Sequence, residues 1–251
     1  MTEKPLTGKI AREAIGVLDI PRYPAATIAA YRALGDATGA ISDAMDELGL
    51  QGVIAASTLK PTMPDAMIVG PAVTLRNIMQ PTQPGVGARD RVSKMAEIEG
   101  HNLSGPGDVL VIEGANDISN MGGISATIGK RQGQIGAIVD GGVRDVAEQR
   151  RIGYPVWSRS ITAVTGKWRL HTIAVNVPVQ IAGVQVRPGD LIVADPSAVC
   201  VIPREHVDAV LVRAQQITEG EKNRYADIEA GVSVPDLAKR THVFKFKDSA
   251  S

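Results

Sequence analysis

The stretch AIVDGGVRD, residues 137–145, decides the fold and points to the chemistry of this chain. Its apolar run predicts a buried strand that ends at Asp140. The two glycines that follow let a ligand approach the main chain closely. Arg144 is a planar cation suited to a carboxylate or enolate, and Asp145 is a hard oxygen ligand suited to a divalent cation. Because ligands collect at the carboxyl ends of strands in α/β sheets, the stretch predicts a site for a small oxo acid. An Arg-Asp pair in the first turn of a helix is also ordinary surface chemistry.

Composition limits the class of protein. The 251 residues suit one large domain, or one domain with extensions, and 44% are hydrophobic, although only 3% are aromatic. Lys+Arg and Asp+Glu balance at 27 each, which gives no support for a nucleic-acid or membrane partner. Cys200 lies in an apolar run and is expected to be a buried thiol. A single cysteine and the lack of a signal peptide or apolar span of about 20 residues favour the cytoplasm.

The first part of the chain is expected to be an arm followed by helices and a strand. Residues 1–23 read as a loosely structured arm, and residues 80–87, rich in Pro and Gly, as a loop. Residues 66–75 read as a strand with a Gly-Pro interruption. Patterning predicts helices over 25–33, 37–50 and 89–101.

The turn Pro-Gly-Asp occurs twice, at 106–108 and 188–190, and each copy starts an apolar strand that ends in an acid. This indicates two equivalent layers of one β-rich body. Further elements are expected as follows: a helical stretch at 119–131, a strand at 135–140, a helix at 143–151, a strand near 155–159 and a long helix at 204–222. The fold class is α/β, with too many short strands after residue 155 for a simple alternating parallel sheet.

Two loops carry further candidate residues. Residues 122–125 (Gly122, Gly123, Ile124, Ser125) lead into an expected helix start, where backbone N–H groups can hold an anion. The order of elements would bring them beside Arg144. Residues 167–171 place three basic side chains around a Trp; they could form a lid on a distal carboxylate, a solvated loop or a subunit contact. Zinc-hydrolase, serine-hydrolase and P-loop motifs are absent.

An ordered set of segments resembles the RraA-like family, which includes class II pyruvate aldolases acting on 4-hydroxy-4-methyl-2-oxoglutarate and 4-carboxy-4-hydroxy-2-oxoadipate, and the regulator of ribonuclease activity A. The resembling segments are 42–50, 70–74, 106–111, 139–145 and 176–190. The resemblance implies a compact α/β/β/α sandwich similar to the swivelling phosphohistidine domain of pyruvate-phosphate dikinase. It also implies a homotrimer or homohexamer with sites near subunit boundaries.

The resemblance further implies roles for individual residues. Arg144 would bind the 2-oxo acid and stabilise a pyruvate enolate, and Asp145 would carry the metal, Mg²⁺ or Mn²⁺. Backbone groups of Gly122–Ser125 would contact the pyruvate part. This chain has Gly123 where the aldolases commonly carry an acid that serves in proton transfer. The missing acid affects aldol cleavage more than decarboxylation of oxaloacetate, because the loss of carbon dioxide needs no base.

The leading hypothesis is therefore a divalent-metal-dependent carbon–carbon lyase on a small 2-oxo acid: an aldolase, an oxaloacetate decarboxylase or both. Two alternatives stay open: a non-catalytic regulator that binds ribonuclease or helicase partners, and a related hydro-lyase on a sugar-derived oxo acid. The domain division expected is an N-terminal arm and helix over 1–35, a catalytic domain over 36–222 and a C-terminal extension over 223–251.

Overall fold

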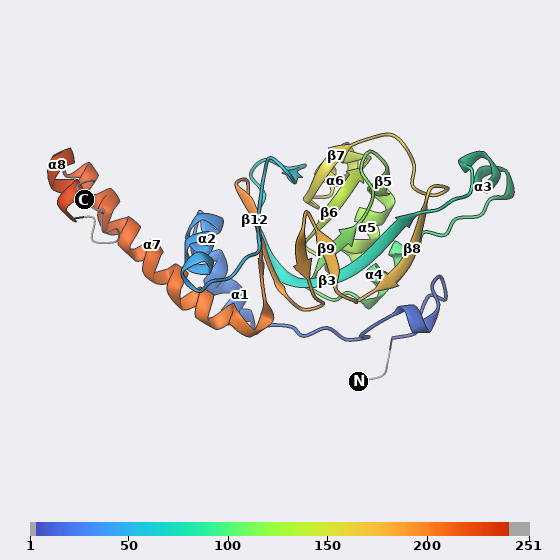
Figure 1. Ribbon diagram of the computed structural model, residues 1–251, viewed down its shortest axis with the longest axis horizontal. Helices are drawn as coiled ribbons and strands as arrows, with labels where there is room; N and C mark the ends of the chain where they lie inside the picture. Colours follow the sequence, from blue (N-terminus) through green and yellow to red (C-terminus); the bar gives the residue numbers. More distant parts are fainter. Residues whose placement is uncertain (1–3, 241–251) are drawn as a thin grey trace, which may run out of the picture.

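The computed structural model describes residues 4–240, and Figure 1 shows two packed sheets flanked by helices. The helices are α1 (Ala25–Arg32), α2 (Ala37–Glu47), α3 (Pro84–Asp90), α4 (Glu97–Leu103), α5 (Gly123–Arg131), α6 (Val146–Arg151), α7 (Val207–Glu229) and α8 (Val234–Arg240). The strands are β1 (Val53–Ala55), β2 (Lys60–Pro61), β3 (Ile68–Met79), β4 (Val109–Glu113), β5 (Ser119–Met121), β6 (Gly136–Val143), β7 (Val156–Ile161), β8 (Leu170–Val175), β9 (Val179–Ile181), β10 (Val184–Val186), β11 (Leu191–Ala194) and β12 (Ala198–Ile202).

These elements form four layers. Strand β11 pairs antiparallel with the start of β3, β12 pairs antiparallel with β11, and β1 pairs antiparallel with β12. From Ala72 onward β3 pairs with β4, and β4, β6 and β7 follow side by side, all parallel. One apolar cluster joins α1, α2 and α7 to the first sheet, a second lies between the sheets, and a third joins α4 and α5 to the second sheet. Three apolar interfaces separate four layers, so the predicted α/β/β/α sandwich is confirmed.

Strand β3 connects the two sheets. Its residues 68–71 pair with β11, and its residues 72–76 pair with β4. A Cβ at Gly70 would lie 2.1 Å from the carbonyl oxygen of Gly107, so only glycine fits where the strand changes sheets. The predicted Gly-Pro interruption does not break the strand, which continues to Met79. At this point the strand instead changes its pairing partner from β11 to β4.

The two Pro-Gly-Asp turns start β4 and β11, one in each sheet. Gly107 and Gly189 have φ of 87° and 85°, a left-handed conformation that glycine adopts without strain. The carboxylates close the turns: Asp108 accepts a bond of 2.7 Å from the N–H of Gly105, and Asp190 one of 2.8 Å from that of Arg187. The prediction of two layers is confirmed, but the layers are not equivalent, because β4 pairs parallel with its neighbours and β11 pairs antiparallel.

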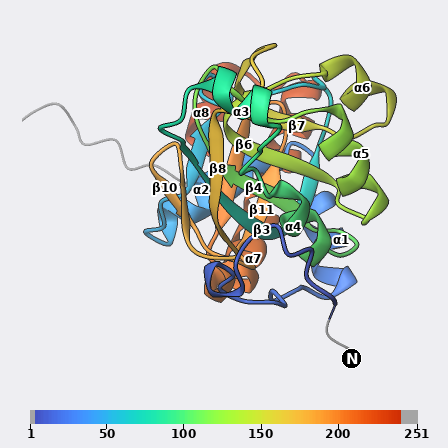
Figure 2. The same ribbon diagram turned by 90° about the vertical axis from the view of Figure 1, so that its right-hand side faces the viewer.

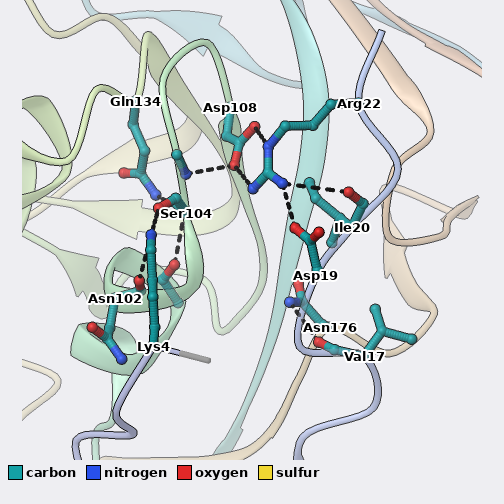
Figure 3. Close-up of polar contacts among 12 residues, drawn as sticks. Lys4, Val17, Asp19, Ile20, Arg22, Asn102, Ser104, Asp108, Gln134 and Asn176 are labelled. Carbon is teal, nitrogen blue, oxygen red and sulfur yellow. Dashed lines mark hydrogen bonds and ion pairs between the residues drawn. The ribbon is translucent and has the colours of Figure 1, made fainter. Parts of the chain in front are cut away.

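The N-terminal arm is held against the body, contrary to the expectation of a loose segment (Figure 3). The guanidinium of Arg22 makes a bidentate ion pair with the buried carboxylate of Asp108, at 3.0 and 2.8 Å. Lys4 donates a bond of 2.6 Å to the carbonyl oxygen of Ser104. Ile20, only 3% exposed, fills the apolar cluster under the second sheet. Charge patterning on the arm gave no sign of these partners, which lie about a hundred residues away.

Several predicted boundaries need correction. The helix expected over 89–101 is two helices, because the chain breaks at Arg91 (φ 55°) and α4 begins only at Glu97. The loop expected over 80–87 contains the start of α3, where Pro84 fits the first turn. The stretch expected to be helical from residue 119 opens with β5. The last long helix begins at Val207 and runs to Glu229.

Figure 1 shows the second half of α7 projecting from the body, with α8 folded beside its end. Residues 1–3 and 241–251, which include the ends of the arm and of the C-terminal extension, lie outside the described residues. Cys200 is fully buried, as predicted. Over residues 4–240, no helix has the length and apolar character needed to cross a bilayer.

Candidate functional site

A pocket of about 140 Å³ lies where the start of α5 meets the end of β6. Figure 2 shows α4 and α5 on the same side of the second sheet, with α6 beyond α5. The site is at the carboxyl end of a parallel strand, the usual position in α/β proteins. Its lining comprises Glu97, Ile98, His101, Gly122, Ile124, Ser125, Ile128, Arg144, Asp145 and Lys167.

Arg144 and Asp145 follow β6 directly and point into this pocket. Asp145 has a left-handed backbone (φ 58°, ψ 40°), tolerable for Asp. Its side chain does not cap α6; instead Oδ2 accepts a bond of 3.0 Å from the N–H of Gly123. Nε of Arg144 lies 3.5 Å from the same oxygen, and the two side chains are 31% and 49% exposed. Both groups are thus anchored and still reach solvent.

The glycines at 122 and 123 permit this close contact. A Cβ at Gly122 would lie 2.6 Å from Oδ2 of Asp145, and one at Gly123 would lie 2.9 Å from Cγ of Glu148. Side chains at either position would push Asp145 or α6 away. Position 123 therefore carries no acidic side chain, and Glu148 of α6 fills the space that a side chain there would occupy.

The first turn of α5 supplies hydrogen-bond donors. The N–H groups of Ile124 and Ser125 find no acceptor among residues 4–240, as expected for the start of a helix. Unpaired N–H groups and the positive end of the helix dipole attract anions. With the guanidinium of Arg144 opposite, the pocket can hold a carboxylate or a developing oxyanion.

The Ser125 hydroxyl is used inside the protein. It lies 2.7 Å from Nε2 of His101, and Nδ1 of that ring lies 3.0 Å from Oε1 of Gln134. Gln134 donates through its amide nitrogen to Ser104, so its oxygen faces the ring and His101 is the donor at Nδ1. Burial lowers the pKa of His101 to about 4, so the imidazole is neutral at pH 7. The hydroxyl hydrogen of Ser125 is therefore engaged by His101, and the donor that Ser125 offers an anion is its backbone N–H.

Two acid–base groups on the opposite wall were missed by sequence reasoning. Glu97 is half-buried, and burial raises the pKa of its carboxyl, partly offset by the positive charge of Lys167. His101 is on the same helix, four residues later. The spacing i, i+4 places both on one helix face, and this signal could have singled them out.

The basic loop 167–171 has mixed roles. Lys167 lines the pocket, whereas Trp168 packs against Gly87 of α3 and Arg169 donates to the carbonyl of Thr165 at 3.0 Å. One of the loop's three basic residues thus faces the site. Across residues 4–240, no cluster of three or more His, Cys, Asp or Glu could hold a metal ion by itself.

Comparison with known proteins places this chain among the Aldolase/RraA sequences, whose RraA-like family model matches residues 38–201. A Halalkalibacterium halodurans protein named "Putative 4-hydroxy-4-methyl-2-oxoglutarate aldolase" is 33% identical over 77% of this chain and 81% of its own length. Among solved structures, an uncharacterised protein of Pseudomonas syringae superposes with a TM-score of 0.72 and 26% identity, over 88% of this chain and 96% of that one. Streptomyces coelicolor RraAS2 is described as an unusual member of the RNase ES inhibitor RraA protein family. It superposes with a TM-score of 0.65 and 25% identity, over 80% of this chain and 96% of that one.

Proposed function

The chain belongs to the RraA-like Aldolase/RraA family, and from this premise we propose that it is a lyase that cleaves a carbon–carbon bond in a small 2-oxo acid. The substrate proposed is of the 4-hydroxy-4-methyl-2-oxoglutarate type, with oxaloacetate decarboxylation as a second reaction of the same site. The name of the Halalkalibacterium halodurans relative supports the aldolase reaction.

One observation carries the proposal: a guanidinium and two unpaired N–H groups converge on a pocket of about 140 Å³. A 2-oxo acid carries a carboxylate beside a carbonyl, and cleavage places negative charge on that carbonyl oxygen. Donors fixed in advance stabilise such charge without reorganisation. Arg144 and the first turn of α5 would hold the carboxylate and stabilise the enolate.

The carboxylate of Asp145 fits a divalent cation of the Mg²⁺ or Mn²⁺ type. Its Oδ1 accepts no hydrogen bond from residues 4–240, and its side chain is 49% exposed. Magnesium keeps several waters in proteins and needs only one or two carboxylates plus its substrate, so the single acid suffices. The bound cation would act as a Lewis acid on the substrate's oxo group.

The test is pyruvate release from oxaloacetate and from 4-hydroxy-4-methyl-2-oxoglutarate, with Mg²⁺ and with excess chelator. We expect the wild type to release pyruvate only with the metal and Asp145→Ala to lose this turnover. Release from oxaloacetate alone would support the enolate chemistry and assign a different natural substrate. No release from any 2-oxo acid, or full turnover in chelator, would contradict the proposal.

The likeness to RraAS2 supports a second candidate, a regulator that binds a ribonuclease. A pull-down with a purified ribonuclease, compared between wild type and Arg144→Ala, separates the two. A regulator would bind regardless of the pocket, whereas a lyase needs Arg144 and shows turnover. A homotrimer or homohexamer in the cytoplasm stays part of the proposal, and light scattering measures the assembly.

A further inference from the structure

Glu97 occupies a distinctive position in the pocket. It is the first residue of α4 and lines the wall opposite the start of α5. The helix beginning there is fixed on both sides: Thr172 accepts the N–H of Ala96 at 2.8 Å, and α4 packs against α5. The carboxyl of Glu97 is therefore carried on a rigid element and not on a loop.

The Glu97 carboxyl is also uncommitted. Within residues 4–240, no other residue donates a hydrogen bond to this carboxyl, and no cation lies within ion-pair distance of it. The donor that contacts the carboxyl is the backbone N–H of Glu97 itself. Other acids near the site are engaged. Asp145 accepts from the N–H of Gly123, and Glu148 pairs with Arg151 at 2.6 Å.

We propose that Glu97 is the proton-transfer residue of this site, a role that rests on the proposed lyase function. As a carboxylate, Glu97 accepts the proton of the substrate's C4 hydroxyl. The C4–O bond becomes a carbonyl, the C3–C4 bond breaks, and its electron pair forms the enolate of the first three carbons. Glu97 then returns the proton to C3, which gives the methyl group of pyruvate. No proton is gained or lost over the cycle.

The surroundings suit this role. Burial raises the pKa of Glu97, which brings the carboxyl nearer to the pH at which it can both accept and donate a proton. The charged and titratable groups around the pocket are Lys167, Arg144, Asp145 and neutral His101. Of these, Lys167 is the one whose charge acts on the Glu97 carboxyl.

Glu148 is the rival carboxylate because its side chain lies against Gly123. The guanidinium of Arg151 holds the pKa of Glu148 below its usual range, which makes it a weak base. Glu148 also does not line the pocket. Since the two side chains are chemically identical and lie on either side of the start of α5, Glu148→Gln is a matched control for Glu97→Gln.

Exchange of the C3 protons of pyruvate in D₂O, followed by proton NMR with Mg²⁺ present, reads proton transfer directly. We expect Glu97→Gln to slow this exchange at least about 100-fold, because a general base typically accelerates proton transfer by this factor or more. Glu148→Gln should exchange within a few-fold of the wild type. Carbon dioxide release from oxaloacetate, which needs no base, should persist in Glu97→Gln. Wild-type exchange should fall as the pH drops through the Glu97 pKa, and Glu97→Asp should keep that profile at a lower rate.

The outcomes are distinct. Exchange by Glu97→Gln at the wild-type rate would overturn the role of Glu97 while leaving the lyase function intact. Loss of exchange in both Gln variants, or loss of carbon dioxide release along with exchange in Glu97→Gln, would indicate a structural effect and also overturn the role. A wild type that neither exchanges pyruvate nor turns over a 2-oxo acid would overturn the function and the role together.

Discussion

Acid should destabilise this protein through His101. The imidazole is completely buried, and its two nitrogens are engaged by Ser125 and Gln134. Burial lowers the pKa of His101 from 6.5 to about 4. The unfolded chain takes up this proton below pH 6.5, whereas the folded chain does not until about pH 4. Stability from this group is fully present above pH 6.5 and is lost as the pH falls toward 4.

A shift of this size corresponds to about 3 kcal/mol of unfolding free energy. Urea unfolding between pH 7 and 4.5, followed by fluorescence of the buried Trp157, measures it. His101→Asn is the comparison, because it cannot titrate. Glu97 acts in the opposite direction, since its raised pKa favours the folded state in acid, but both proteins share that contribution. A free-energy difference between wild type and His101→Asn that does not change with pH would refute the reasoning.

Three further substitutions test other parts of the structure. Arg144→Lys should lower kcat/KM at least about 100-fold with an unchanged melting temperature, because an ammonium cannot replace the planar fork; a near-normal rate would argue against carboxylate binding there. Arg22→Ala should lower the unfolding free energy by about 3 kcal/mol, because the fully buried Asp108 carboxylate loses its cation; urea midpoints measure this, and an unchanged midpoint would show that the arm contributes little. Gly123→Asp should destabilise by about 1–3 kcal/mol, because its Cβ would lie 2.9 Å from Cγ and 3.0 Å from Cβ of Glu148. In a Glu148→Gly background, which lacks both atoms, the same substitution should cost much less, and an equal cost in both backgrounds would contradict the steric account.

Residue patterns predicted an α/β body with two β layers, because its strands are short, apolar and bounded by turns with fixed chemistry, whereas the four-layer sandwich was implied by the family resemblance. The repeated Pro-Gly-Asp turn marked one strand in each sheet, since each Asp closes its own turn through local backbone bonds. Residues 122–125 could be placed beside Arg144 for a similar reason, because successive parallel strands put their following loops at one edge. Local patterns were sufficient wherever the deciding contacts are local.

Sequence patterns failed where distant partners decide the structure. The break at Arg91 interrupts a region with continuous helical patterning, and the bridge between Lys94 and His171 holds the chain extended there. The arm was read as loose because Arg22 shows no pattern that reveals Asp108 as its partner. Glu97 was missed because its position opposite Arg144 depends on how α4 packs against α5.

The pocket thus has two walls of different origin. The end of β6 and the start of α5 form a wall that carries the Arg144 guanidinium and N–H groups, and these two elements follow one another along the chain. The other wall is α4, which is held by Thr172 and α5 and is also contacted by the N-terminal arm. Thr7 of the arm donates a bond of 2.9 Å from its N–H to the buried carboxylate of Glu99, and Lys4 binds the carbonyl oxygen of Ser104 just after the helix. Because Glu97 is two residues from Glu99, the arm belongs to the architecture of the site, although it contributes none of the residues that line the pocket.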